Sequence, residues 1–251
     1  MTDRAKLLKL EAAIAERPQV EIEITHHFAP GVYAREMFVP AGVLLTGKIH
    51  KTEHLNILSQ GRLSISGTGK SMTVKAPFAY VSVIGTKRAI YAHEDSTWTT
   101  IHATEETDLD VIEDMTIAKS FTELDNLLAR DDYASFLIDS DVTEDDVQEM
   151  THQPHNLTPL PPTGLNIQPS DIHGTGLFAH LPIKKGTIIA LMKDGGEKTL
   201  AGRYCNHSGS PNAEMVIVNE SLINLIALRD IDDEEITTDY RNNIRVQEDL
   251  T

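Results

Sequence analysis

Short runs of alternating hydrophobic and polar residues fill the chain between residues 20 and 104. They are rich in β-branched residues and are separated by Gly, Pro or Lys-Thr, the pattern of short strands joined by turns. The runs are Val20–Ile24, Tyr33–Val39, Leu55–Leu58, Leu63–Ser66, Tyr80–Ile84 and Thr97–Ile101. Many short strands at near-regular spacing predict a β-sandwich or a β-barrel.

A short helix is predicted ahead of these strands, within residues 1–17. Its apolar residues share one side at helical spacing: Leu7, Leu8, Leu10 and Ile14. Pro18 ends the helix, because proline has no backbone N–H and does not fit a helix interior.

The pattern changes over residues 105–150, which are densely acidic. Ser120–Arg130 has helical spacing with a serine cap, and Thr143–Val147 opens a second helix with acidic residues in its first turn. His152–Pro162 then holds four prolines, which make a stiff connector. Short strands resume after it, at Leu177–Ala179, Thr187–Met192, Met215–Val218 and Leu222–Leu228.

The chain is therefore predicted to be mainly β, with a domain boundary in the proline-rich connector. Its expected parts are a helix over 1–19, a β-rich domain over 20–104, an acidic helical segment and linker over 105–163, and a second β-rich domain over 164–251.

Composition narrows the classes of partner and location. The 251 residues carry a net charge of −16, which disfavours nucleic-acid binding and favours a basic protein partner, unless the acidity serves solubility alone. The single cysteine, Cys205, excludes an internal disulfide framework. No run approaches the roughly 20 apolar residues of a membrane helix, and the polar start of the chain is no secretory signal, so we expect a cytoplasmic protein.

Four segments of the C-terminal part follow one another in an informative order. They are His173–Ala179 with a Gly-Thr-Gly turn, Pro182–Ile189, Arg203–Ser208, and Glu234–Arg241. Each alone has a purely structural explanation, such as a tight turn or a buried Asn-His pair. Their joint occurrence, in this order and at close spacing, favours a shared functional site over four separate structural features.

Residues 164–242 resemble the SET domain of protein-lysine N-methyltransferases. The resemblance implies a small β-fold with a pseudoknot, S-adenosylmethionine as cofactor, and Tyr240 as the active-site tyrosine. It also implies that Asn206 and His207 lie beside Tyr240 and hold the cofactor. The other cofactor-binding residues that it implies are His173, Gly174, Thr175, Gly176, Leu177, Arg203 and Tyr204.

Methyl transfer to a lysine requires a neutral amine, and deprotonating a free lysine at pH 7 costs roughly 4–5 kcal/mol. A narrow, dry channel next to a sulfonium lowers that pKa, and the hydroxyl of Tyr240 orients the amine.

The chain departs from the family in one respect. SET enzymes usually carry an insert that builds the substrate groove, whereas Met192–Gly202 leaves room only for a loop, and only Arg241–Thr251 follows the tyrosine. The missing walls are therefore expected from the acidic 105–150 segment, the N-terminal domain or a second subunit.

Residues 20–104 resemble a small cupin domain. Of the family's four metal-ligand positions, Lys48 and Arg88 occupy two, while His50 and His54 occupy the others. Metal binding by His50 and His54, aided by His93 or His102, is one interpretation. The other is a metal-free barrel that mediates assembly or binds an anion near Lys48, Lys87 and Arg88. His26 and His27 are interpreted as a strand edge.

The cupin part also looks like cupin-like proteins of tailed phages and prophages, which implies a phage origin and a host cytoplasm. The leading hypothesis is a lysine methyltransferase whose cupin-like domain forms a homo-oligomer and whose substrate is a basic protein, with neither nucleic acid nor membrane as partner. The alternatives are a catalytically silent SET-like binding protein and a metal-dependent cupin enzyme.

Overall fold

The computed structural model describes residues 3–67, 71–151, 159–161 and 164–242, and they form two compact units. The first unit is Met1–Leu124 and the second is Asp125–Thr251. Most of the proline-rich connector, where the sequence places a domain boundary, lies outside the described residues. Each unit is described by itself below.

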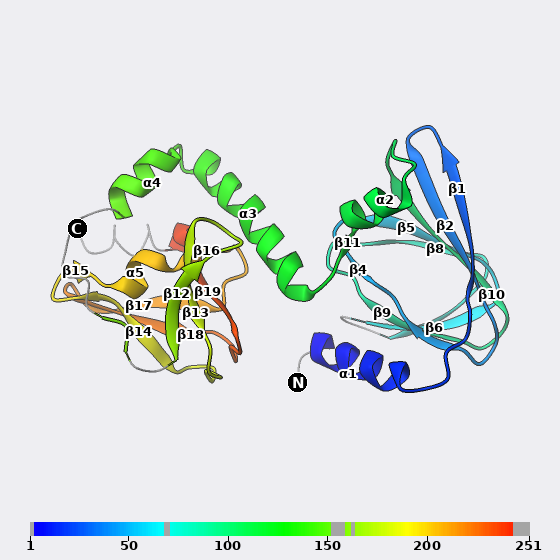
Figure 1. Cartoon of the computed structure of the whole chain (residues 1–251), viewed down its shortest axis with the longest axis horizontal. Helices are drawn as coiled ribbons and strands as arrows, with labels where there is room; N and C mark the ends of the chain where they lie inside the picture. The colour runs from blue at the N-terminus through cyan, green and yellow to red at the C-terminus, as the bar shows by residue number, and fades with distance from the viewer. Residues whose placement is uncertain (1–2, 68–70, 152–158, 162–163, 243–251) are drawn as a thin grey trace. The chain divides into compact units, whose positions relative to one another are not determined.

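Two antiparallel sheets make up the first unit, with a two-stranded ladder beside them (Figure 1). The larger sheet has the order β1(Glu23–Ala29), β2(Val32–Val39), β10(Ser96–Ala103), β5(His54–Gln60), β8(Phe78–Ser82). The smaller sheet has the order β3(Leu44–Thr46), β9(Arg88–Ala92), β6(Arg62–Gly67), β7(Met72–Lys75). The ladder joins β4(Ile49–His50) to β11(Ile117–Ala118). Among the described strands the two sheets stay separate, so the predicted barrel is not closed.

The core of this unit is packed by alternate residues of the strands. Leu58, Leu63 and Ile65 are almost fully buried, and Trp98 is 3% exposed. In β10 burial alternates strictly from Ser96 to His102, as expected for a strand with one face against the core.

Helices flank the sheets of the first unit. The helix α1(Asp3–Ala15) ends before Pro18, as predicted, and α2(Leu109–Thr116) is capped by the Asp108 carboxylate. Leu7 is buried, whereas Leu8 is 45% exposed, so the predicted apolar side of α1 is wrong for Leu8.

The second unit contains two sheets of four strands each. One has the order β12(Leu165–Pro169), β13(Thr175–Ala179), β19(Glu234–Thr238), β16(Asn206–His207). The other has the order β15(Glu197–Lys198), β14(Ile188–Asp194), β18(Leu222–Ala227), β17(Ala213–Asn219). Leu177, Leu225, Ile231 and Ile236 are fully buried in the core of the unit.

One pairing positions the candidate site. The two-residue strand β16 runs parallel to β19, with Asn206 opposite Thr237 and His207 opposite Thr238. Because the chain continues from Thr238 to Tyr240, this register brings Asn206 and His207 beside the tyrosine. The juxtaposition is the one that the SET resemblance implies.

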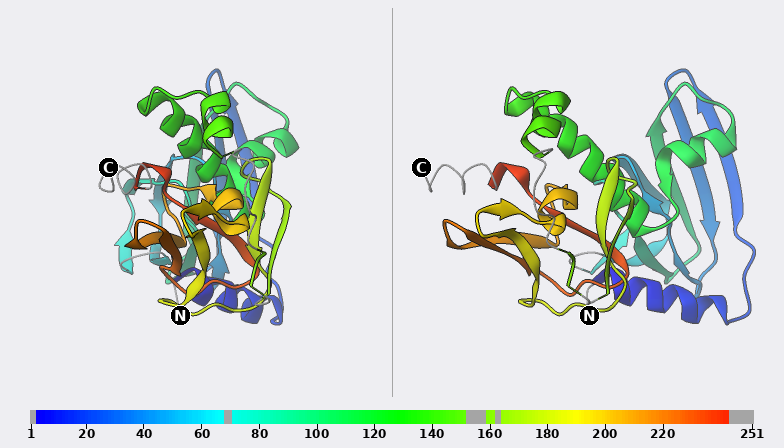
Figure 2. Two further views of the ribbon diagram at one scale, coloured as in Figure 1. Left: turned by 90° about the vertical axis from the view of Figure 1, so that its left-hand side faces the viewer. Right: turned by 60° about the vertical axis from the view of Figure 1, so that its left-hand side comes forward.

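Three helices accompany these sheets: α3(Phe121–Asp139), which reaches the second unit from Asp125 on, α4(Glu144–Thr151) and α5(Leu200–Tyr204). At the start of α3 the Ser120 hydroxyl accepts from the amide of Glu123, and the Glu123 carboxylate accepts from the amide of Lys119. Thr143 and Asp146 cap the start of α4 reciprocally. Both views of Figure 2 show α3 and α4 on the same side of the second unit as α5.

Candidate functional site

The turn that carries the Gly-Thr-Gly motif is fixed by its own backbone and by Ser170. The amide of Ser170 donates to the carbonyl of Gly174 over 3.0 Å, and the Ser170 hydroxyl accepts from the amides of Ile172 and His173. Gly174 has φ +52°, a left-handed conformation that favours glycine. A side chain there would meet nothing within 4 Å, so the backbone of Gly174 lies open.

Gly176 is required for a different reason. A Cβ at this position would overlap the carboxylate of Glu235, which is 7% exposed and accepts hydrogen bonds from Ser170 and Asn206. Burial raises the pKa of Glu235. The close packing of this carboxylate therefore explains the second glycine of the motif.

Asn206 ties the glycine turn to the sheet. Its side-chain amide is within 2.7 Å of Glu235 Oε1 and 3.0 Å of the carbonyl of His173, and it also contacts Ser170. The amide thus holds the turn in place through nitrogen–oxygen contacts that an aspartate could not make.

His207 is fully buried and has a partner at each ring nitrogen. Its Nδ1 lies 3.0 Å from the backbone nitrogen of Tyr240, and its Nε2 lies 2.8 Å from Oδ2 of Asp132. Because a backbone N–H only donates, Nδ1 must accept, and the ring proton then sits on Nε2 and donates to Asp132. Burial lowers the pKa of His207 although Asp132 opposes the shift, so the ring is neutral at pH 7.

Tyr240 points into the same site. Its hydroxyl donates to the carbonyl of Cys205 over 2.9 Å, and its ring packs edge-on against Tyr133 and Phe136 of α3. Burial, followed by nearby electronegative groups that include Glu144, raises the pKa of Tyr240. Tyr240 is therefore a neutral phenol that donates one hydrogen bond.

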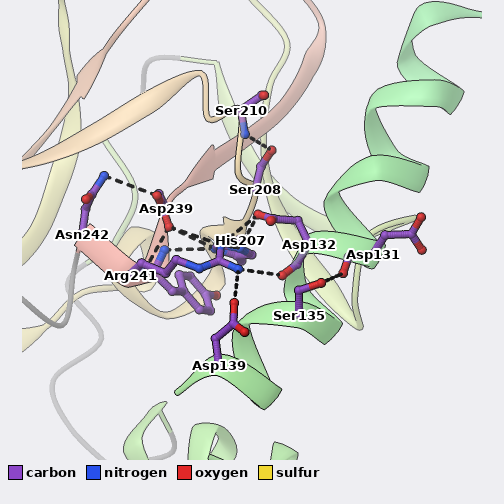
Figure 3. Close-up of polar contacts among 11 residues, drawn as sticks. Asp131, Asp132, Ser135, Asp139, His207, Ser208, Ser210, Asp239, Arg241 and Asn242 are labelled. Carbon is purple, nitrogen blue, oxygen red and sulfur yellow. Dashed lines mark hydrogen bonds and ion pairs between the residues drawn. The ribbon is translucent and has the colours of Figure 1, made fainter. Parts of the chain in front are cut away.

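Ion pairs with Arg241 hold helix α3 against this site. Figure 3 shows Asp132 and Asp139 of α3 directed toward His207 and Arg241. Arg241 Nη1 lies 3.1 Å from Asp132, and Arg241 Nη2 lies 3.5 Å from Asp139. The acidic residues of this segment are thus directed at the residue that follows the candidate tyrosine.

Helix α4 joins α3 to the glycine turn. Tyr133 donates to Glu144 over 2.7 Å, and Glu144 lies 3.3 Å from His173 in the glycine turn. Burial and the Glu144 carboxylate raise the pKa of Tyr133. Through these contacts α3 and α4 supply a wall that the sequence left open, and it comes from the acidic segment, one of the three expected sources.

These elements surround a cavity of about 220 Å³. Its lining includes residues from three of the four motif segments, Pro182–Ile189 contributing none, and from both helices: His173, Gly174, Thr175, Arg203, Tyr204, Asn206, His207, Tyr240, Tyr133, Val147 and Gln148. Gly176 and Leu177 are absent from the lining, and the side chain of Leu177 is buried in the core instead.

Sequence reasoning missed the contribution of Asp132, Tyr133 and Glu144. A helix with aromatic residues at i and i+3 reads as an ordinary packing helix, and no local signal separates Asp132 from its acidic neighbours. Only the tertiary fold gives these residues their place.

The candidate residues of the first unit also converge. His50 of β4, His54 of β5 and His102 of β10 have potential ligand atoms within 4.8 Å of one another. His93 lies elsewhere, 2.7 Å from Ser64. His27 is on the exposed strand β1, as expected for a strand edge.

Lys48, Lys87 and Arg88, the cations near which an anion site was predicted, lie in three different environments. Lys87 is buried and paired with Glu11 over 2.7 Å, which removes it from the expected anion site. Lys48 is exposed and paired with Glu113. Arg88 remains, and it lines the same cavity as the three histidines.

Comparison with known proteins bears on both units. Residues 190–241 match the family model described as SET domain. The match leaves the Gly-Thr-Gly turn outside its limits. No curated protein matches the chain, and none of the described helices is long and apolar enough to cross a membrane.

Solved structures similar to the N-terminal part include cupin proteins. KdgF from Halomonas sp. shares 18% identity with a TM-score of 0.31, covering 36% of this chain and 88% of that one. A cupin-2 domain containing protein from Shewanella frigidimarina shares 14% with a TM-score of 0.28, covering 38% and 92%. An acetylacetone dioxygenase from Acinetobacter johnsonii shares 16% with a TM-score of 0.30, covering 34% and 61%.

The two expected resemblances differ in extent. The N-terminal part is similar to cupin-domain proteins, while the phage origin stays a prediction. In the C-terminal unit, the match to the SET-domain family model is confined to residues 190–241.

Proposed function

We propose that the C-terminal unit transfers a methyl group from S-adenosylmethionine to the side-chain amine of a lysine in a protein substrate. The observation that carries the proposal is the cavity in which the glycine turn, the Arg203–His207 segment and Tyr240 meet. These three segments are far apart in the sequence, and only Tyr240 and the Arg203–His207 segment lie within the family match.

The residues of the cavity fit this cofactor. The open backbone of Gly174 leaves room for close approach, and the buried polar segment at Asn206 and His207 offers hydrogen-bonding groups. Burial is the main reason that the pKa of Tyr240 is raised, and the nearby carboxylates of Glu144 and Glu235 add to it. Carboxylates near the cavity suit a positively charged sulfonium. When bound, the cofactor supplies an electrophilic methyl group.

The chain's own residues would then orient the acceptor. Two hydrogen bonds hold Tyr240. Its hydroxyl donates to the carbonyl of Cys205, and its backbone amide donates to Nδ1 of His207. A phenol fixed at two points can position an amine with little loss of freedom, and such positioning is a large part of the rate enhancement in a displacement reaction. The surrounding aromatic side chains of α3 exclude water and favour the neutral amine.

Calorimetry with S-adenosylhomocysteine, the demethylated product, tests the cofactor first. We expect stoichiometric binding to the full chain, and its absence would contradict the proposal. Incubation with labelled S-adenosylmethionine and a cell lysate, followed by mass spectrometry, then identifies the acceptor. Cofactor binding without any labelled protein would instead support the catalytically silent alternative.

Tyr240→Phe is the matching variant. We expect it to lower methyl transfer by about a hundredfold, because the phenol no longer orients the amine, while binding of S-adenosylhomocysteine is kept. Tyr91→Phe removes the hydroxyl of a 40% exposed tyrosine in the other unit and serves as control. Equal turnover of Tyr240→Phe and the unmodified chain would exclude Tyr240 as the active-site tyrosine.

A further inference from the structure

The interior of the first unit has an apolar end and a polar end. Along the inner face of β10, Trp98 is followed by Thr100 and His102. Trp98 lies opposite Met37 of β2, and Thr100 lies opposite Arg35. The same strands that build the core therefore carry polar and charged side chains into the other end of the interior.

A cavity of about 310 Å³ occupies the region where the two ends meet. Its lining includes Arg35, His50, His54, Arg88, Trp98 and His102. This volume lies at the small end of the range for ligand pockets, about 300–1,000 Å³. The cavity lies within the first unit and is separate from the proposed methyl-transfer site.

Arg88 is half-buried, and one of its buried nitrogen atoms has no hydrogen-bond partner. Its Nε is buried without a hydrogen bond, its Nη2 lies 3.3 Å from the Ser82 hydroxyl, and its guanidinium stacks 4.8 Å from the centre of the Tyr80 ring. A buried polar atom without a partner is costly unless a ligand supplies one.

Arg35 is in a similar position. Its Nη1 contacts the sulfur of Met37, and burial lowers its pKa. Within the described part of the chain, no carboxylate forms an ion pair with Arg35 or Arg88. Glu113 lines the cavity too, but it is paired with Lys48, so the two arginines leave the lining positively charged.

The metal that the cupin resemblance implies does not fit this lining. His54 contacts the carbonyl of Thr52 through Nδ1 and so keeps a free lone pair at Nε2, which a metal can use. However, Arg35 and Arg88 line the same cavity as the three histidines, and their positive charges repel a divalent cation. The cavity is lined by three imidazoles and by two guanidinium groups that form no ion pair with a described carboxylate, a set that suits a negative ligand.

We propose that this cavity binds a small organic acid, whose carboxylate pairs with Arg35 and Arg88 and whose apolar body packs against Trp98 and Met37. Guanidinium groups bind carboxylates through charge-assisted hydrogen bonds, which are stronger than those between neutral groups. The apolar end of the cavity selects acids with a hydrophobic body.

Paired ligands test the charge directly. Acetate and phenylacetate are titrated into the full chain by calorimetry, with acetamide and phenylacetamide as neutral counterparts of the same shape. We expect both acids to bind better than their amides, and phenylacetate to bind better than acetate. Trp98 is the single tryptophan of the chain, so its fluorescence should change on phenylacetate binding.

Variants locate the site. Arg88→Gln and Arg35→Gln should each weaken phenylacetate binding about tenfold or more, because each removes a charge-assisted hydrogen bond. Arg62→Gln, which alters an exposed arginine paired with Glu94, should change the affinity less than twofold.

Two results would overturn the proposal. One is equal binding of the acids and their amides, which needs no variant to fold. The other is stoichiometric binding of zinc chloride to the chain that is lost in His102→Gln, because a site built for an anion has no such affinity.

Discussion

His50, His54 and His102 lie in the interior of the N-terminal unit, where burial is the main reason that the pKa of each imidazole falls below 6.5. The pKa is about 3 for His50 and about 4 for His102. Neighbouring histidines and the arginines add to this shift, since a charged ring would face other positive groups.

These shifts predict that the N-terminal unit loses stability as the pH falls from about 6.5 toward 4. In that window these histidines are protonated in the unfolded chain but stay neutral in the folded chain, so acidification favours unfolding. Each histidine that stays neutral at pH 5 costs about 2 kcal/mol of unfolding free energy relative to pH 7. Urea unfolding at the two pH values, followed by Trp98 fluorescence, measures this loss.

His102→Gln separates this effect from the titration of carboxylates. The variant should reduce the stability difference between pH 7 and pH 5, because it lacks one group that takes up a proton only on unfolding. His27→Gln, on the exposed strand β1, should leave the difference as it is. An identical pH dependence in His102→Gln and the unmodified chain would mean that His102 is protonated in the folded state.

The two glycines of the 173–177 turn illustrate how one residue type serves two needs. Gly174 is required by its positive φ, and Gly176 by the carboxylate packed against it. The sequence predicts both positions from a family pattern, in which they allow approach of the cofactor. It could not predict the second reason, because Glu235 is 59 residues away.

At the scale of elements, α3 is the part that completes the C-terminal site. Its contact with the Asn206–Gly209 segment is close, since a Cβ at Gly209 would overlap the carboxylate of Asp132. That carboxylate cannot turn away freely, because it is bonded to His207 and Arg241. Gly209 therefore sets how near α3 approaches.

Gly209→Ala is expected to push α3 away from His207 and to destabilise the C-terminal unit by about 1–3 kcal/mol, as overpacking does. Cofactor binding should weaken with it, because Tyr133 of α3 lines the cavity. Thermal unfolding and calorimetry with S-adenosylhomocysteine measure the two effects. Gly47→Ala is the control, since a Cβ there meets only ordinary contacts near 3.8 Å. Unchanged stability and binding in Gly209→Ala would show that α3 is not held in this way.

The elements that the sequence predicted best are those with local signals. Alternation located β2, β5, β6 and β10 within a few residues, and Ser120 marked the start of α3. The pattern placed the end of that helix near Arg130, whereas it continues to Asp139. The two-residue strand β16 is too short for any periodicity, and its parallel partner comes about 30 residues later, so only the family resemblance anticipated it.

At the scale of the whole molecule, the described residues form a large hydrophobic core in each compact unit, and the first unit has a further small cluster of Ile49, Ala118, Phe121 and Leu124. Each core is made of residues from its own unit. The two proposed ligands also belong to different units, the organic acid to the first and the cofactor to the second.

This division predicts two unfolding transitions that ligands shift independently. Phenylacetate should raise the midpoint of the transition seen by Trp98 fluorescence, because Trp98 lies in the first unit. S-adenosylhomocysteine should raise a second transition, seen by circular dichroism, and leave the fluorescence transition in place. A single transition that both ligands shift equally would contradict independent unfolding.

The sequence could identify the chemistry of the C-terminal site but not its enclosure. Asn206, His207 and Tyr240 belong to short motifs that can be recognised in the sequence, whereas Tyr133 and Asp132 come from a helix without a recognisable motif. For the N-terminal cavity, Arg88 was recognised as a cation at a ligand position, but Arg35 was not singled out. Its role depends on the pairing of β2 with β10, which places it opposite Thr100.

The contact between His207 and Asp132 offers a direct spectroscopic report on α3. The imidazole is 1% exposed, and its Nε2 proton is shared with a carboxylate, so the proton exchanges slowly with water. Such a proton gives a resolved signal far downfield in a proton NMR spectrum. Its disappearance on warming or in Asp132→Asn would record detachment of the helix while the rest of the unit keeps its fold.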